Sequence, residues 1–233
     1  MILETFAQFD LSLLLALNGS DSLYLDGVMW AITRTSTWLL FFCALFYLIV
    51  KNNDFRQTLL IVLLVVLVVV VADQVASGLC KPYFQRYRPS RDPEISHLID
   101  VVNGYRGGKY GFFSSHASNT FAVATFFALL FRRFGVTVCL YIWAILCSYS
   151  RLYLGVHYPS DVFTGLCFGV FTGIVFHGIY KYISKRYFSS PSHFSSKYTA
   201  SGYLVQDFYV LLSAFSITCL YISLRALWYA VSF

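Results

Sequence analysis

The stretch Gln57 to Ala72, QTLLIVLLVVLVVVVA, contains no charged side chain. A helix that crosses a bilayer needs roughly 20 mostly apolar residues. Uncharged stretches of similar length occur at Thr35 to Val50, Val136 to Ser150, Val162 to Tyr180 and Phe208 to Leu224. A sixth, Ala117 to Phe131, is short but extends backwards through residues 113–116. The pattern predicts an all-α fold, a polytopic membrane helix bundle of about six transmembrane helices.

The composition supports a membrane protein. Of the 233 residues 58% are hydrophobic and 12% are charged, against roughly 25% charged in a soluble domain. The net charge of +6 is scattered over loops, which favours anionic lipid over nucleic acid as the partner. We expect one membrane-embedded domain over residues 1–233 and no obligate protein partner. The Ser-rich stretch from Tyr187 to Ala200 predicts a flexible connection before the last helix.

The first 18 residues form an apolar segment without the basic start or the A-x-A pattern of a signal peptide. Apolar side chains recur every three or four positions, at Ile2, Phe6, Phe9, Leu13 and Leu17. This spacing predicts an amphipathic helix at the membrane interface. A helix packed on the bundle is the equal alternative.

Cofactor motifs are missing from the sequence. There is no carboxylate cluster, no Cys/His ligand set and no Gly-rich nucleotide loop, so we expect neither a metal nor another cofactor. Six cysteines fall almost entirely inside the apolar stretches without paired loop spacing, and we interpret them as packing residues. They are Cys43, Cys80, Cys139, Cys147, Cys167 and Cys219.

Three polar elements lie on one side of the membrane if six helices cross. They are Lys81 to Pro89 (KPYFQRYRP), Phe113 to His116 (FSSH) and Ser150 to Asp161 (SRLYLGVHYPSD). Lys81 would then end the second helix, Ser114 would start the third, and the stretch from Arg151 to Asp161 would join the fourth to the fifth. Together they supply three cations, a hydroxyl, two imidazoles and a carboxylate. These groups are Lys81, Arg88, Arg151, Ser114, His116, His157 and Asp161. This set is suited to cleaving a phosphoester without a metal.

The cations predict an anion site. A charge at the centre of a membrane helix costs about 2.5 to 3.5 kcal/mol, and three clustered cations repel one another, so a bound phosphate would relieve both penalties. Arginine forks suit bidentate contact with phosphate oxygens. Ser114, at the expected start of the third helix, could donate its hydroxyl and its backbone N–H to the phosphate, where the helix dipole favours an anion. An ordinary N-cap is its alternative function.

His157 and Asp161 are four residues apart, which places them on one face of a helix. A carboxylate that holds one ring nitrogen leaves the other free to attack phosphorus. A lone histidine in an apolar context is usually structural, but Arg151 six residues upstream favours a catalytic one. His116 is placed to protonate the leaving alkoxide.

The order K-x6-R-P, S-x-H and S-R-x5-H-x3-D resembles the signature of the type 2 phosphatidic acid phosphatase and vanadium haloperoxidase superfamily. The resemblance covers about Asp73 to Gly169, the catalytic core, and departs from the usual P-S-G-H at Phe113 and Ser115. It implies that His157 is the nucleophile, Asp161 its orienting partner and His116 the general acid. The implied phosphate ligands are Lys81, Arg88, Ser114 and Arg151, to which we add Ser115 and His116.

The resemblance implies a metal-independent lipid phosphatase that works through a phosphohistidine. Members of the family act on phosphatidic acid, phosphatidylglycerol phosphate, undecaprenyl diphosphate or lipid A. The short loops and compact bundle favour a bacterial inner-membrane enzyme acting on one of the last two. A vanadate-dependent haloperoxidase and a non-catalytic phospholipid binder or transporter are the alternatives.

Short basic loops predict the orientation, because such loops favour the cytoplasm. They fall opposite the three polar elements, at Lys51, Arg56, Arg132, Arg133, Lys181, Lys185 and Arg186. The site is therefore expected to face the periplasm, with both termini on that side unless the first helix inserts as a hairpin. The loop from Ser90 to Gly111 would read the lipid headgroup, or be a plain surface loop. Asp73, Arg34 and Arg225 are expected to make polar contacts between helices.

Overall fold

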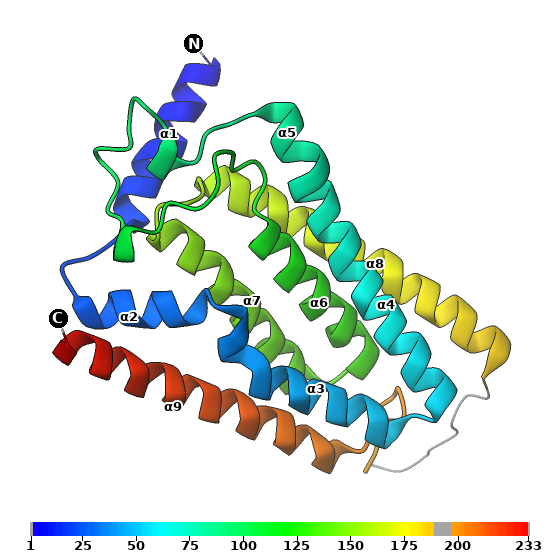
Figure 1. The fold of residues 1–233 in the computed structure, drawn as a ribbon. Coiled ribbons are helices and arrows are strands. Elements are labelled where there is room, and N and C mark those ends of the chain that lie inside the picture. The colour runs from blue at the N-terminus through cyan, green and yellow to red at the C-terminus, as the bar shows by residue number, and fades with distance from the viewer. Residues whose placement is uncertain (1, 189–196, 233) are drawn as a thin grey trace.

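A computed structural model describes residues 2–188 and 197–232 (Figure 1), and that part of the chain is helical without a β-strand. The π-helical turn Gln74–Cys80 joins α4 and α5 into one continuous rod. The all-α prediction is confirmed. The helices are α1 (Ile2–Leu17), α2 (Leu23–Ile32), α3 (Leu39–Asn52), α4 (Phe55–Asp73), α5 (Lys81–Phe84), α6 (Ser115–Phe131), α7 (Phe134–Tyr153), α8 (Pro159–Tyr187) and α9 (Phe208–Ser232).

Within residues 2–188 and 197–232, five helical runs are long and apolar enough to cross a membrane, and α6, with 17 residues, corresponds to the sixth predicted crossing. The five are Thr35–Asn52, Phe55–Phe84, Phe134–Tyr153, Pro159–Tyr187 and Val205–Ser232. Two predicted boundaries were wrong. The second crossing does not end at Lys81 but continues to Phe84, and α7 extends to Tyr153, so Arg151 lies on a helix and not in a connection.

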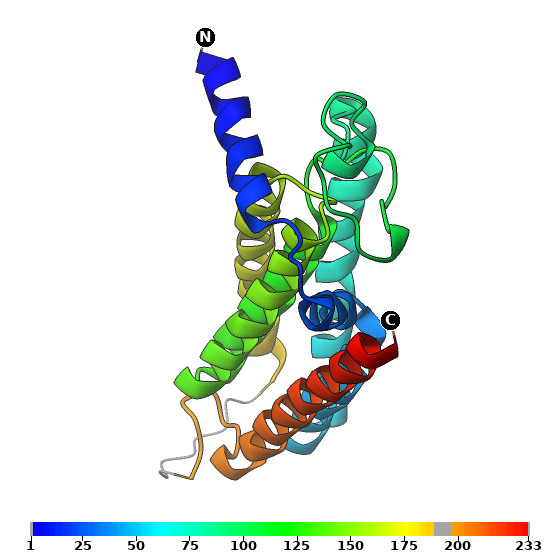
Figure 2. The same cartoon turned by 90° about the vertical axis from the view of Figure 1, so that its left-hand side faces the viewer.

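The predicted N-terminal helix exists as α1, which extends away from the bundle at the end where α5 lies (Figure 2). Of its predicted apolar stripe, Phe6 and Phe9 are more than half exposed, and Leu13 is also exposed. Asp10 and Leu14 are buried instead. Leu17, the last residue of the stripe, packs against Ala117, Leu152 and Val162. The stripe thus faces away from the bundle along most of α1 and packs on the bundle at its end, so both alternatives describe part of the helix.

Helix α2 was not predicted, because its ten residues are too few to cross a membrane and Asp26 interrupts the apolar pattern. Ser22 caps its first turn by accepting a hydrogen bond from the N–H of Leu25 at 3.3 Å. It lies along α9 (Figure 1), where a Cβ on Gly27 would be 2.9 Å from the Cα of Ala226. The absent side chain therefore allows the two helices to touch.

Helix α6 is largely buried, and α8 packs closely along it. Gly165, Gly169 and Gly173 recur every four residues on α8. A Cβ on each would lie 2.5, 2.4 and 2.7 Å from the backbone oxygens of Ser114, Ser118 and Ala122. This glycine stripe brings the two backbones together, and it places the first turn of α6 beside the first turn of α8.

The three polar elements meet at one end of the bundle, as predicted. The π turn leads into α5 there, α6 and α8 begin there, and α7 ends there (Figure 1). The basic residues at the end of α3, between α6 and α7 and at the end of α8 lie at the opposite end. Most of the Ser-rich connection, residues 189–196, lies outside the described residues.

The three other intramembrane charges make local contacts, so the prediction of contacts between helices was wrong for them. Asp73 accepts from Ser77 at 3.4 Å, and Arg225 donates to Tyr221 at 3.2 Å, each within one helical run. Arg34 lies over the ring of Trp30, 4.8 Å from its centroid.

Candidate active site

Arg88 lies at the end of the bundle where the three polar elements meet, which we call the polar end. Its guanidinium donates to the backbone oxygens of Tyr110 and Val156, both at 3.2 Å, and to Nε2 of His157 at 3.1 Å. The side chain is buried, and burial together with the charge of Arg151 lowers the pKa of Arg88 to about 10. A buried cation beside another cation favours binding of an anion between them.

Arg151 is that second cation, and only 2% of it is exposed. It donates to the hydroxyl of Thr33 and, at 3.2 Å, to the hydroxyl of Tyr105. Its Nε is buried and has no hydrogen-bond partner in the described part of the chain. Thr33 is the cap of the unpredicted helix α2, so this contact could not be foreseen from the motif.

Lys81 lies at the start of α5 and connects to α6. Its Nζ donates to Ser77 at 3.0 Å and to the hydroxyl of Ser115 at 3.3 Å. Ser115, which stands where the family has glycine, thereby touches one of the three predicted phosphate ligands.

Ser114 has a different arrangement from the one predicted. Its backbone N–H, expected to face a phosphate, donates to the backbone oxygen of Asp161 at 3.0 Å. Its hydroxyl accepts from the N–H of Ala117 at 3.4 Å. Ser114 is therefore the N-cap of α6, as the alternative interpretation predicted. The prediction that its backbone N–H faces a phosphate was wrong, because this N–H links α6 to α8.

His157 and Asp161 do lie together, but not because they share a helix. His157 precedes α8, which begins at Pro159, and Asp161 accepts from the N–H of Tyr158 at 3.1 Å as part of the cap. The cap turns the carboxylate back towards the ring, with Oδ2 3.6 Å from Nδ1 of His157. This distance is longer than that of a hydrogen bond between the two atoms. The shared-face prediction was wrong, whereas the pairing it predicted is present.

The electrostatic setting keeps His157 neutral. The ring is 1% exposed, and burial, reinforced by the cations Arg88, Arg151 and Lys81, holds the pKa of His157 well below its ordinary value. Because Nε2 accepts from Arg88, the proton of the neutral ring resides on Nδ1, facing Asp161. A neutral imidazole with a lone pair on Nε2 is the form that can attack phosphorus.

Sequence reasoning also missed Arg86 and Asp10, which lie at the same end of the bundle. Arg86 donates to Asp161 Oδ1 at 2.8 Å, to Ser160 at 2.7 Å and to Asp10 Oδ2 at 2.7 Å. Both were visible as anomalies: Arg86 is a second arginine inside the Lys81 to Pro89 element, and Asp10 is an acid within an apolar helix.

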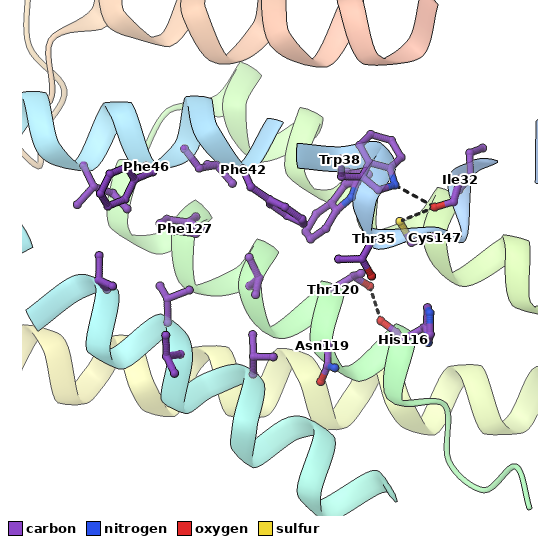
Figure 3. A pocket seen from close by; sticks show the side chains of 18 of the residues that line it. Ile32, Thr35, Trp38, Phe42, Phe46, His116, Asn119, Thr120, Phe127 and Cys147 are labelled. Atoms are coloured by element: carbon purple, nitrogen blue, oxygen red, sulfur yellow. Dashed lines mark hydrogen bonds between the residues drawn. The ribbon is translucent and has the colours of Figure 1, made fainter. Parts of the chain in front are cut away.

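A cavity of about 510 Å³ leads away from the polar end between α3, α4 and α6 (Figure 3). His116, Asn119 and Thr120 line the end of the cavity nearest the three polar elements. His116 lies in the first turn of α6, directly after Ser115, to which Lys81 donates. The remaining wall is mainly aliphatic and aromatic, including Phe42, Phe46, Val62, Val66 and Phe127. An apolar chain attached to a phosphate at the site could extend into this cavity.

Known proteins match most of the chain. The family model of the PAP2 superfamily matches residues 58–185. The lipid A 4'-phosphatase of Porphyromonas gingivalis is 32% identical over 220 residues, which cover 94% of this chain and 93% of the relative. The lipid A 4'-phosphatase of Bacteroides thetaiotaomicron is 37% identical over 187 residues, 79% of this chain and 83% of the relative. No solved structure was found to match. The chain therefore belongs to the PAP2 superfamily and is a membrane-embedded lipid phosphatase.

Proposed function

We propose that the chain removes the 4'-phosphate of lipid A at the periplasmic face of the bacterial inner membrane. The observation that carries the proposal is the apolar cavity that begins at His116 and runs into the bundle. Such a cavity suits a phosphate whose leaving group carries long acyl chains. Similarity over nearly the full length to relatives named lipid A 4'-phosphatase supports lipid A over undecaprenyl diphosphate.

The first chemical step forms a phosphohistidine. Lys81, Arg88 and Arg151 bind the non-bridging oxygens and balance the charge that develops on them, with the hydroxyls of Ser114 and Ser115 beside them. Arg88 turns from Nε2 of His157 towards the phosphate, and that nitrogen forms a bond to phosphorus. The bond from phosphorus to the lipid oxygen breaks. His116, which takes up a proton when the phosphate dianion binds and offsets the three cations, gives that proton to the lipid oxygen.

The second step restores the enzyme. Water attacks phosphorus, His116 accepts a proton from this water, and the bond between phosphorus and Nε2 breaks. Asp161 stabilises the positive ring during the lifetime of the intermediate, because its carboxylate lies 3.6 Å from Nδ1. The products are inorganic phosphate and the dephosphorylated lipid.

The orientation follows from the charges at the two ends. Short basic loops mark the end opposite the site, and such loops favour the cytoplasm. The site would then face the periplasm, where a phosphate in the outer leaflet of the inner membrane can reach it.

The test is phosphate release by purified protein from lipid A, undecaprenyl diphosphate, phosphatidic acid and glycerol phosphate at matched concentrations. We expect the highest kcat/KM on lipid A, with release of the 4'-phosphate and retention of the 1-phosphate by mass spectrometry. Equal kcat/KM on glycerol phosphate, or a preference for undecaprenyl diphosphate, would contradict the proposal. His157→Ala measured alongside shows whether the released phosphate comes from this site.

A further inference from the structure

Asp10 is an acid with almost no access to water. It lies in α1, 3% exposed, and accepts from the N–H of Ser160 at 2.9 Å as well as from the Ser160 hydroxyl and Arg86. A buried carboxylate is costly unless cations and donors satisfy it. Asp10 meets both requirements with residues that adjoin Asp161. Helix α1 therefore makes a buried polar contact with residues that surround the proposed nucleophile, His157.

Arg86 connects the two carboxylates. One guanidinium nitrogen lies 2.8 Å from Asp161 and the other 2.7 Å from Asp10, so the fork spans both. The guanidinium also stacks on the ring of Tyr158, with its central carbon 3.9 Å from the ring centroid. A guanidinium held at two ends and one face has little rotational freedom, so the position of Asp161 depends on that of Asp10.

Asp161 has few other restraints. Its Oδ2 accepts from the N–H of Tyr158 and lies 3.6 Å from His157, and its Oδ1 accepts from Arg86. Without Asp10, Arg86 would be held only by Ser160, Asp161 and the ring of Tyr158. Its partly exposed side chain, 30% accessible, could then turn towards water and release Oδ1.

We infer that Asp10 of the N-terminal helix is a positioning residue, which acts through Arg86 to hold Asp161 against His157. The inference rests on the proposed roles of His157 and Asp161. It gives α1 a part in the reaction. Neither Asp10 nor Arg86 would touch the phosphate, so both should affect turnover more than substrate binding.

The experiment is a double-mutant cycle in the full-length protein with Asp10→Asn, Arg86→Ala and the double variant, assayed on lipid A micelles. A hydrogen bond to a charged group is worth roughly ten- to a hundredfold in an equilibrium. We therefore expect kcat to fall about tenfold or more in each single variant, with KM changed less than about twofold. In the Arg86→Ala background, Asp10→Asn should have little further effect, because the link is already broken.

Three controls separate this role from folding. Ser12→Ala alters an exposed hydroxyl of α1 that donates only to the backbone of Phe9, and it should leave kcat unchanged. Leu14→Ala removes a buried contact of α1 with Ile99 and Tyr158 but keeps Asp10, so it should lower the Tm with a smaller loss of kcat than Asp10→Asn. Asp10→Glu should recover part of the kcat lost in Asp10→Asn, because it restores the charge.

The outcomes separate this inference from the proposed function. Full activity in His157→Ala would contradict the proposed mechanism and, with it, the proposed role of Asp161. Loss of activity in His157→Ala with wild-type kcat in Asp10→Asn would overturn the inference alone. Multiplicative losses in the double variant, or a loss seen in KM, would likewise show that Asp10 does not act through Arg86.

Discussion

Replacing Gly165 with alanine should separate α6 from α8 next to the site. A Cβ at this position would lie 2.5 Å from the backbone oxygen of Ser114, and ordinary contact begins at 3.4 Å. The helices must therefore part by up to 3.4 − 2.5 = 0.9 Å locally, because a backbone oxygen cannot rotate away. The shift would move Ser114, and with it the start of the helix that holds His116, relative to Asp161.

Two magnitudes follow for Gly165→Ala. Overpacking of a close contact costs typically about 1–3 kcal/mol, so the Tm in detergent should fall. A displacement of about 1 Å of reacting groups can cost roughly a hundredfold in rate, so kcat on lipid A should fall by about that factor.

Gly178 is the matched control for this substitution. It lies on the same helix, and a Cβ there would have nothing within 4 Å, so Gly178→Ala should raise stability by roughly 0.5–1 kcal/mol and leave kcat unchanged. Thermal unfolding and phosphate release measured on both variants make the comparison. Wild-type stability and turnover in Gly165→Ala would refute the close-packing argument.

Three other predictions concern charge and the cavity. Activity should survive EDTA and be inhibited by orthovanadate, because the cations do the work that Mg²⁺ does elsewhere; loss in EDTA restored by Mg²⁺ would contradict this. Arg88→Met should move the acid limb of kcat/KM to higher pH, because removing a cation raises the pKa of His157 from its lowered value towards about 6.5, and an unmoved limb would exclude His157 as the titrating group. Val66→Trp should fill part of the cavity, raising KM for lipid A severalfold and leaving hydrolysis of glycerol phosphate unchanged; an equal effect on both substrates would show that no acyl chain binds there.

The sequence predicts the membrane helices well because apolar side chains alone decide them. The uncharged stretch Gln57 to Ala72 predicts a membrane helix, and it forms most of α4. The π turn after it is different. Its residues, Gln74–Cys80, lead directly into α5, and a π turn has no signature in the apolar pattern. The helix continues past Lys81, where the pattern predicted its end.

The sequence predicted that the three polar elements would lie together, but it did not predict all of their contacts. Arg88 and His157 are 69 positions apart and share a hydrogen bond. The order of the motifs and the predicted helix ends placed both on one side of the membrane. The contacts of Thr33 and Asp10 were not predicted. Thr33 caps α2 and Asp10 lies in α1, and the position of each at the site depends on how its helix packs on the bundle. A contact between residues 76 positions apart, such as Asp10 with Arg86, depends on how α1 seats on the bundle.

The central claim is a covalent phosphohistidine at position 157. Its most direct test is to quench wild type and His157→Ala during turnover of lipid A labelled with ³²P at the 4'-phosphate, and to follow the label on the protein. The account predicts a labelled wild-type protein that loses its label in acid and keeps it in alkali, and no label on His157→Ala. Label bound to His157→Ala, or turnover of that variant within tenfold of wild type, would contradict the phosphohistidine mechanism.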